Sequence, residues 1–321
     1  MQTTFARDTL LDADIAEVKK AIYRQLEGSS GEIRDAVSSM VEANAKMLRP
    51  TFLLLAARIG KFAAPKFYDL AAAVEMLHMA TLAHDDVIDD SPTRRGKAAL
   101  HTLYGKRTAI LIGDLLFSRC FHLAAEYTTI ENGRKLARAV SVICESEIRQ
   151  GTDRFSLDVS RRRYLRRITG KTSALFVLSF YIGGQESGAP KRTVSALHRA
   201  GYNIGMAFQI IDDILDYSGD AHNLGKPTGT DLREGVITIP LIYALEQDRG
   251  DLRKLLDEFP YTDDTVADII AMTSALGGIQ RARELAELYT NRALRELSRL
   301  PGGRSKELLI EYVKTLLVRD F

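Results

Sequence analysis

The 321-residue sequence has no tryptophan and only two cysteines, Cys120 and Cys144. Two cysteines in so long a chain cannot form a disulfide framework, and they are typical of a protein in the reducing cytosol. The N-terminal stretch lacks the basic start and the apolar run of a secretory signal. No apolar run reaches the length that a membrane span needs. The sequence therefore predicts a soluble, cytoplasmic protein.

A strong net charge and the motifs of nucleophilic catalysis are also missing. The 44 Lys and Arg against 42 Asp and Glu leave a net charge of +2, too small to favour nucleic acid as the main partner. There is no GxSxG motif and no evident activated Cys–His pair. The basic run Arg161–Arg167 could bind nucleic acid or a membrane surface. A solvated helix face explains it better, because the rest of the chain is balanced in charge.

What the sequence does contain is helical spacing of apolar residues from end to end. Because 45% of its residues are hydrophobic, the chain can bury a large core. No linker or repeat divides it, so we expect one all-helical domain over residues 1–321. The expected helices are Asp8–Leu26, Glu32–Ala45, one opened by Pro50, Lys66–Asp90, Arg107–Tyr127, Arg134–Phe155, Ser160–Gly183, Arg192–Asp216, Val236–Leu245 with a kink at Pro240, and a last set ending in Leu308–Val318.

Four aspartates fall within six residues at the end of the expected helix 66–90, in the stretch LAHDDVIDDSPTRRG. They are Asp85, Asp86, Asp89 and Asp90. Asp85 and Asp89 lie one helical turn apart on one face, and the other two form a second pair on a rotated face. Stacked carboxylates repel one another unless a cation compensates them. Hard oxygen ligands on an apolar helix favour Mg²⁺, and the two arginines that follow can bind phosphate oxygens.

A second stretch, FQIIDDILD, repeats this pattern. Asp212 and Asp216 lie four residues apart, and Asp213 and Asp216 lie three apart. These carboxylates interrupt an apolar helix, where charge is costly unless it is paired or binds metal. Lys226 and Asp231 follow in the loop GKPTGTD. One such helix is a weak signal, but two with DDxxD spacing, each followed by basic residues, indicate a site for metal and diphosphate.

Three motifs together carry a family resemblance: DDVIDD…RRG, KT at Lys171–Thr172, and FQIIDDILDY…LGKPTGTDLREGVITIPLIYAL. They resemble the trans-isoprenyl diphosphate synthases, the polyprenyl synthetase family, over almost the whole chain, and the bacterial long-chain enzymes most. The resemblance implies an all-α bundle of the isoprenoid synthase type with a central cavity. It also implies a prenyltransferase that joins isopentenyl diphosphate to an allylic diphosphate primer, with Mg²⁺ assisting ionisation.

The resemblance further implies a role for each matching residue. The expected catalytic residues are Asp85, Asp89, Lys171 and Asp212. The expected ligands of three Mg²⁺ ions per active site are Asp85, Asp86, Asp89, Asp212, Asp213 and Asp216. The residues expected to bind the allylic diphosphate are Arg94, Lys171, Thr172, Gln209 and Lys226. Those expected to bind isopentenyl diphosphate are Lys46, Arg49, His78 and Arg95.

The length of the product is expected from the helix that precedes the first cluster. If the diphosphate is anchored at Asp85, the growing tail runs back along this helix past Thr81 and Ala80, which are small. The sequence therefore predicts a long all-trans product of about C30–C40, with heptaprenyl the best single estimate, for quinone side chains. The alternatives are a geranylgeranyl or farnesyl synthase, a class I terpene cyclase with one diphosphate substrate, and a non-catalytic helical subunit.

The expected partners follow from the same resemblance. Alanine-rich helices of this family pair through a large interface, so we expect a homodimer or a heterodimer with a small regulatory subunit. Nucleic acid is not expected as a partner. A transient contact with a membrane surface is expected where the apolar product is released.

Overall fold

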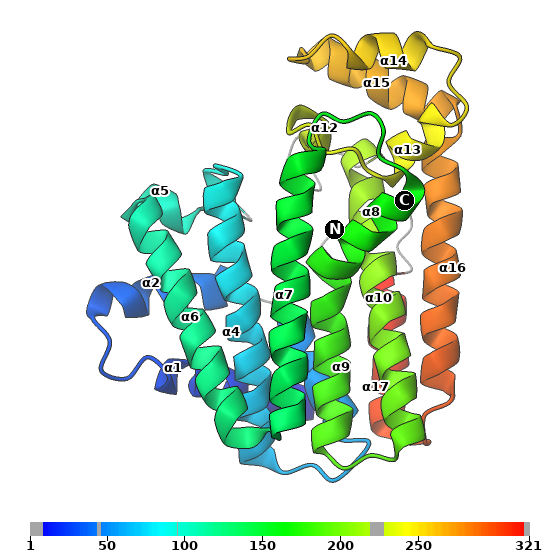
Figure 1. Ribbon diagram of the computed structural model, residues 1–321. Coiled ribbons are helices and arrows are strands. Elements are labelled where there is room, and N and C mark those ends of the chain that lie inside the picture. Colours follow the sequence, from blue (N-terminus) through cyan, green and yellow to red (C-terminus); the bar gives the residue numbers. More distant parts are fainter. Residues whose placement is uncertain (1–8, 44–45, 95, 219–227, 318–321) are drawn as a thin grey trace.

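A computed structural model describes residues 9–43, 46–94, 96–218 and 228–317 of the chain. Within these ranges the regular structure is helical apart from one short antiparallel hairpin, in which Thr93 pairs with Ala98 and Arg94 with Lys97. Figure 1 shows a bundle of long helices with shorter helices above it. The prediction of an all-α fold is confirmed.

The first part of the chain forms α1 Thr9–Arg24, α2 Gly31–Ala43, α3 Leu48–Ala57, α4 Ala64–Ile88, β1 Thr93–Arg94, β2 Lys97–Ala98, α5 Leu100–Tyr104, α6 Lys106–Tyr127 and α7 Ile130–Asp153. The second part forms α8 Arg161–Ile168, the π-helical segment η1 Thr169–Ser173, α9 Ala174–Glu186, α10 Lys191–Ser218, α12 Thr230–Arg233, α13 Ile239–Leu245, α14 Asp251–Leu256, α15 Asp263–Ala275, α16 Gly278–Ser298 and α17 Arg304–Leu317. The expected boundaries of the long helices agree with these to within a few residues.

Two expectations about individual helices were wrong. Pro240 was expected to kink a helix that starts at Val236, but α13 begins at Ile239, so the proline lies in its first turn. Proline fits there without a kink, because the first N–H groups of a helix have no partner within it. The second expectation was that no apolar stretch reaches the length of a membrane span, but α6 is long and apolar enough, by length and composition alone, to cross a membrane. In the bundle it lies along α4, and that contact accounts for its buried apolar face (Figure 1).

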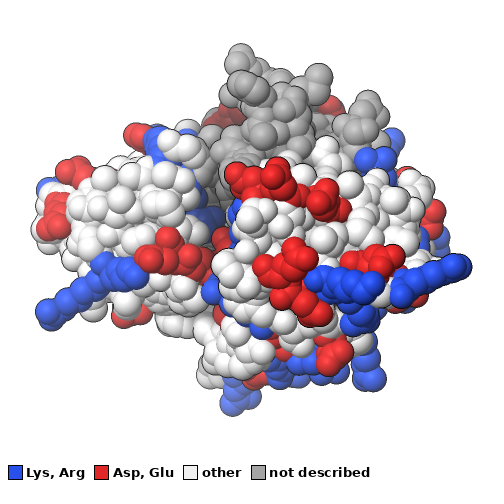
Figure 2. All heavy atoms as spheres, turned by 90° about the horizontal axis from the view of Figure 1, so that it is seen from above, with Lys and Arg blue, Asp and Glu red and all other residues white. Residues whose placement is uncertain are grey.

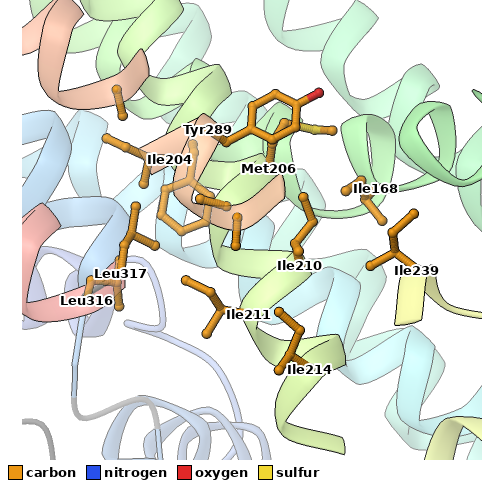
Figure 3. Packing of buried hydrophobic residues seen from close by; sticks show 14 of the residues in the cluster. Ile168, Ile204, Met206, Ile210, Ile211, Ile214, Ile239, Tyr289, Leu316 and Leu317 are labelled. Carbon is orange, nitrogen blue, oxygen red and sulfur yellow. The ribbon is translucent and has the colours of Figure 1, made fainter. Parts of the chain in front are cut away.

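The buried apolar residues form two clusters that meet along α3 and α9. One lies around α10, where Ile204, Ile211 and Ile214 pack near Leu316 of α17 and Tyr289 of α16 (Figure 3). The other is formed by α1, α2, α4, α6, part of α7 and one face of α9. Both α3 and α9 contribute to each cluster. These two helices therefore join the α4 side of the molecule to the α10 side.

A glycine permits the close contact of α3 with α9. A Cβ atom on Gly183 would lie 2.3 Å from the carbonyl oxygen of Leu53, closer than any side chain can approach backbone. The contact holds α4 and α10 at a fixed spacing through the two helices between them. Figure 1 shows the C-terminal ends of α4 and α10 at the same end of the bundle. Both aspartate clusters lie on these ends.

Candidate active site

The first aspartate cluster lies at the C-terminal end of α4. Asp85 is in the last turn, and Asp89 ends the helix by donating its N–H to the carbonyl of Asp85 at 2.8 Å. The Asp89 carboxylate accepts a hydrogen bond of 2.5 Å from Nη2 of Arg154, just after α7. Burial raises the pKa of Asp85 to about 7, the charge of Glu147 adds to this, and nearby cations oppose it. This face of α4 therefore carries carboxyl groups whose burial nearby cations only partly compensate, and it lies next to α7.

The other two aspartates of this stretch lie on a different face. Asp86 is buried and accepts a hydrogen bond of 2.6 Å from Nε of Arg94 on β1. Asp90 is exposed, and a hydrogen bond of 2.8 Å from Lys106 lowers its pKa. The buried pair fixes Arg94 at the edge of the cluster, while the roles of Asp86 toward metal and of Arg94 toward diphosphate stay predictions. Arg95 lies outside the residues that the structure describes.

Lys171 lies between the first cluster and α7. Its Nζ donates to Oε2 of Glu147 at 3.2 Å and to Oε1 of Gln150 at 3.3 Å. Burial lowers the lysine pKa, but the carboxylates of Glu147, Asp85 and Asp89 together outweigh burial and leave the pKa raised. The lysine therefore keeps its charge near neutral pH. It stands in η1, and such widened π turns are frequent at functional sites.

The residue after this lysine contacts the helix of the second cluster. Thr172 donates a hydrogen bond to Oε1 of Gln209 on α10, and Nε2 of Gln209 donates to Oδ1 of Asp213 at 2.8 Å. Two adjacent residues of η1 thus contact α7 with one side chain and α10 with the other. This chain of contacts joins the two aspartate clusters at one end of the bundle (Figure 1).

The second cluster contains one buried and one exposed aspartate side by side. Oδ2 of Asp213 accepts a hydrogen bond of 2.6 Å from the hydroxyl of Tyr164 on α8. Burial raises the pKa of Asp213 to about 7, the charge of Asp212 adds to this, and the bonds from Tyr164 and Gln209 oppose it. Asp212 itself is exposed to solvent. A cation arriving from solvent can therefore reach Asp212 directly.

Asp216 organises the turn that follows α10. Its Oδ1 accepts from the N–H of Thr230 at 3.0 Å and its Oδ2 from the N–H of Asp231 at 3.1 Å, so it caps α12. Gly229 precedes this helix with φ 73°, a conformation that favours glycine. Burial and the neighbouring aspartates raise the pKa of Asp231 well above its ordinary value. Lys226 lies outside the described residues.

The residues expected to bind isopentenyl diphosphate come from α3, its preceding turn and α4. Lys46 is exposed, Arg49 is half-buried and His78 is buried. The guanidinium carbon of Arg49 lies 5.0 Å from the centre of the Phe176 ring, which is 5.6 Å from the ring of Phe208 on α10. Arg49 is therefore held on the side of the second cluster, and the shared binding role of the three residues stays a prediction.

Four residues of the site are not singled out by the sequence reasoning. Glu147, Gln150 and Arg154 lie three, four and seven residues apart, so they share one face at the end of α7 and bind Lys171 and the first cluster. That polar stripe is a signal which the sequence contains. Tyr164 stands among the arginines of the basic run Arg161–Arg167, and nothing in the sequence indicates that it contacts Asp213.

The donors of the two clusters suit Mg²⁺. Among the described residues no three acidic, histidine or cysteine side chains already surround a common point where a metal ion could sit. Burial raises the pKa values of Asp85 and Asp213 to about 7, and the nearby cations and hydrogen-bond donors offset this only in part. Mg²⁺ takes hard oxygen ligands, needs one or two carboxylates, and completes its shell with water and substrate phosphates. The clusters fit such ions when a diphosphate supplies the remaining ligands.

The sequence of the chain places it in a family. The model of the family described as Polyprenyl synthetase matches residues 30–273. Heptaprenyl diphosphate synthase component 2 from Geobacillus stearothermophilus is 36% identical over 316 residues, which cover 98% of this chain and 98% of that protein. The chain belongs to the polyprenyl synthetase family, whose members are prenyltransferases.

Solved structures of this family resemble the whole chain. Heptaprenyl diphosphate synthase from Staphylococcus aureus has a TM-score of 0.92 at 30% identity and covers 97% of this chain and 99% of its own. Geranylgeranyl pyrophosphate synthase from Lactobacillus brevis has a TM-score of 0.91 at 34% identity, with coverage of 97% and 98%. Proteins named for products of different length are thus equally similar in fold. The features that set product length must be sought in individual side chains.

We predict that the metal-free protein loses stability as pH rises from 5 to 8. The folded chain holds protons on Asp85 and Asp213 up to about pH 7, whereas an unfolded aspartate releases its proton near pH 4. Folding therefore becomes less favourable through this window. Urea unfolding in the presence of a chelator should show a smaller decrease for Asp213→Asn, by more than about 1 kcal/mol. Equal pH dependence in wild type and variant would contradict the assignment.

Proposed function

We propose that the chain is a Mg²⁺-dependent trans-polyprenyl diphosphate synthase, which adds isopentenyl diphosphate units head to tail to an allylic diphosphate primer. Membership of the polyprenyl synthetase family supports prenyl transfer. The observation that carries the proposal is the junction formed by Lys171 and Thr172, whose side chains contact α7 and α10. Lys171 is close enough to Asp85 and Asp89 to feel their charge, and its neighbour Thr172 is linked through Gln209 to Asp213 of the second cluster.

The described residues around this junction suit an allylic diphosphate. Lys171 keeps its charge because three carboxylates raise its pKa. Arg94 offers a planar guanidinium whose position is fixed by Asp86. Thr172 and Gln209 are bonded to each other and supply a hydroxyl and an amide. These groups bind and orient the diphosphate, so that its allylic carbon points along the apolar bundle.

The acidic residues of the clusters would hold Mg²⁺ together with that diphosphate. The proposed ligands of the three ions are Asp85, Asp86, Asp89, Asp212, Asp213 and Asp216. Bound Mg²⁺ would neutralise the negative charge that develops on the departing pyrophosphate. Asp85 and Asp213 lose their residual protons when the cations bind, because a nearby positive charge lowers a carboxyl pKa.

A second diphosphate site distinguishes this function from its alternatives. Lys46, Arg49 and His78 are proposed to bind isopentenyl diphosphate, with Arg49 held beside Phe176 on the α10 side. A terpene cyclase has a single diphosphate substrate and needs no such second set. A non-catalytic subunit is disfavoured, because buried acid such as Asp213 would only destabilise it.

The product proposed for this chain is long, around seven isoprene units, as judged from the helical length available behind Asp85. Ala80 is fully buried on α4, and its small side chain leaves the path from the metals open. The name of the Geobacillus stearothermophilus relative, a heptaprenyl synthase component, supports this length. Such a product suits a quinone side chain, and a geranylgeranyl or farnesyl product is the alternative.

The outer faces of α6 and α7 are proposed to mediate assembly. They expose Ile110, Leu111 and Phe121 on α6 and Val142 and Ile148 on α7. We propose that these side chains form one exposed apolar patch, and patches of this kind mark protein interfaces. A homodimer would cover them, and so would a small regulatory subunit, since the relative from Geobacillus stearothermophilus is named as one component of its enzyme.

The remaining expectations about location and partners fit this proposal. We place the enzyme in the cytoplasm as one domain, with transient membrane-surface contact when its apolar product leaves. Figure 2 shows acidic and basic side chains interspersed over the end of the molecule that carries the site. In the part of that end which the structure describes, no extended basic face is available for nucleic acid.

The proposed function predicts the effect of removing charge from each cluster. Asp85→Asn and Asp212→Asn should each lower turnover of isopentenyl diphosphate with farnesyl diphosphate by about 100-fold or more, because each removes stabilisation of the leaving pyrophosphate. Asp90→Asn is the matched control, since Asp90 is bonded to Lys106 outside the site. Near-normal rates in either folded cluster variant would overturn the proposal.

The proposed path of the product predicts the effect of a large side chain near the metals. Ala80→Tyr should block the tail and shift the main product to about three isoprene units, because a tyrosine ring fills the path roughly 7 Å from Asp85 along the helix. Condensation itself should continue. Product lengths are read by mass spectrometry after removal of the diphosphate. A variant that still makes the full-length chain would show that the tail does not follow this face of α4.

The proposed interface predicts how a charge changes assembly. Leu111→Glu should convert the oligomer into a monomer in light scattering, because a charge at a buried contact is costly. Leu288→Glu is the control, since Leu288 is also an exposed leucine but lies on α16, on the opposite side of the bundle (Figure 1). Wild-type protein that is monomeric and fully active would contradict both the homodimer and the heterodimer.

A further inference from the structure

Phe155, the second residue after α7, has a backbone conformation that an aromatic residue rarely adopts. Its φ is 59°, in the left-handed region that favours glycine. The helix ends at Asp153, and Arg154 has already left helical geometry with ψ 137°. Phe155 is 49% exposed, so burial alone does not explain why the chain keeps this conformation. Strain of this kind persists only where the surrounding contacts hold it, and it is frequent at functional sites.

Three contacts hold Phe155 in place. Its N–H donates a hydrogen bond of 2.8 Å to the carbonyl oxygen of Gly235, in the turn after α12, and Figure 1 shows α12 beside the end of α7. Its ring lies against the same glycine, because a Cβ atom on Gly235 would be 2.4 Å from Cε1 of the ring. The ring also packs against Phe259, with centres 4.4 Å apart, and Phe259 packs against Tyr261. Residue 235 therefore has no room for a side chain while Phe155 is in this position.

The residue before Phe155 reaches the first aspartate cluster. Nη2 of Arg154 donates to Oδ1 of Asp89 at 2.5 Å, and both side chains are partly buried. A hydrogen bond between two charged groups is stronger than one between neutral groups. Because Arg154 and Phe155 share a planar peptide bond, the conformation of Phe155 determines the direction from which the guanidinium reaches Asp89.

The residue after Gly235 leads to the second aspartate cluster. The N–H of Val236 donates to the carbonyl oxygen of Asp231 at 2.8 Å, and the N–H of Asp231 donates to Oδ2 of Asp216 at 3.1 Å. Oδ1 of Asp216 accepts from the N–H of Thr230 at 3.0 Å. Gly235 is thus connected, through one turn of hydrogen-bonded backbone, to the carboxylate that caps α12.

The contact of Phe155 with this turn is a second link between the two clusters. It connects Asp89 with Asp216, whereas the link through Lys171–Thr172 connects α7 with Asp213. Two bodies joined at one place can still pivot about it, and a second link at another place fixes their orientation. A ligand bound between the clusters needs a fixed orientation, because small displacements of reacting groups have large effects on rate.

We propose that Phe155 is a positioning residue of the reaction, which fixes Arg154 on Asp89 and holds the two aspartate clusters at the spacing that a diphosphate requires. The inference rests on the proposed function, because it takes both clusters to bind one diphosphate together with Mg²⁺. Phe155 acts through its neighbours and not by contact with the reacting atoms. Its effect therefore falls on the allylic diphosphate and not on the separate site proposed for isopentenyl diphosphate.

The first test is the steady-state kinetics of Phe155→Ala with farnesyl diphosphate and isopentenyl diphosphate. Loss of the ring releases the turn at Gly235, so kcat should fall about 10-fold. KM for isopentenyl diphosphate should stay within about 2-fold of wild type, because its site is not part of this link. Phe155→Tyr keeps the ring and should restore kcat to within about 2-fold of wild type.

A glycine at the same position separates positioning from stability. Phe155→Gly relieves the backbone strain at positive φ but also removes the ring. It should therefore be at least as stable to urea as Phe155→Ala, in which the strain remains, and yet have the same lowered kcat. A kcat that returns to the wild-type value in Phe155→Gly would overturn the positioning role, since activity would then follow stability.

Gly235→Ala tests the contact from the other side. The added Cβ atom must displace the Phe155 ring, so kcat should fall as it does in Phe155→Ala. The double variant should be no slower than the slower single variant, because both changes remove the same contact. Losses of kcat that multiply in the double variant would contradict a shared contact.

Tyr23→Ala is the matched control, since Tyr23 is an exposed aromatic residue on α1, away from the site. It should leave kcat unchanged. Normal kcat in folded Phe155→Ala and Gly235→Ala would overturn the positioning role. An equal loss of kcat in the Tyr23 variant would overturn it as well.

Binding of pyrophosphate separates the failure of this inference from the failure of the proposed function, because it needs no condensation. In calorimetric titration with magnesium pyrophosphate, Phe155→Ala should bind about 10-fold more weakly than wild type, since its clusters are less preorganised. Phe155→Tyr should bind as wild type does. If wild type condenses no isopentenyl diphosphate but Phe155→Ala still weakens binding, the positioning role stands and the proposed function fails. Equal affinity in Phe155→Ala and wild type would overturn the positioning role, whether or not wild type is active.

Discussion

The burial of carboxylates at one end of an apolar bundle is the constraint on which the rest of the site depends. The helices α4 and α10 supply apolar faces to the two cores. Their C-terminal ends carry carboxylates whose charge the protein only partly neutralises. Asp85 and Asp213 consequently keep protons up to about pH 7. Under the proposed function, further cations would offset this cost in stability, and cations that arrive with a diphosphate would make the site selective for it.

The packing of the bundle determines where these carboxylates lie relative to one another. Gly183 allows α3 and α9 to touch, which sets the spacing of α4 and α10, and η1 widens the helix just where Lys171 and Thr172 reach both sides. At the opposite end of the same helices, Asn132 and Glu186 form a polar layer below an apolar cavity. One end of the bundle thus carries the acidic clusters, and buried polar contacts lie at the other end.

Much of this arrangement could be predicted from the sequence, because helical spacing and paired DDxxD motifs are local patterns. The face shared by Asp85 and Asp89 followed from their separation by four residues. The kink expected at Pro240 was wrong because the start of α13 depends on tertiary packing. The pairing of Tyr164 with Asp213 and of Asn132 with Glu186 joins residues about fifty positions apart, so no local pattern could reveal it.

The most direct test of the central claim is calorimetric titration of Mg²⁺ in the presence and absence of inorganic pyrophosphate. The account predicts that pyrophosphate strengthens Mg²⁺ binding, since it supplies the ligands that the clusters lack. It also predicts proton release at pH 6.5 that is nearly absent at pH 8.5, because Asp85 and Asp213 lose protons when cations bind. Mg²⁺ binding that is indifferent to pyrophosphate and releases no protons at pH 6.5 would contradict it.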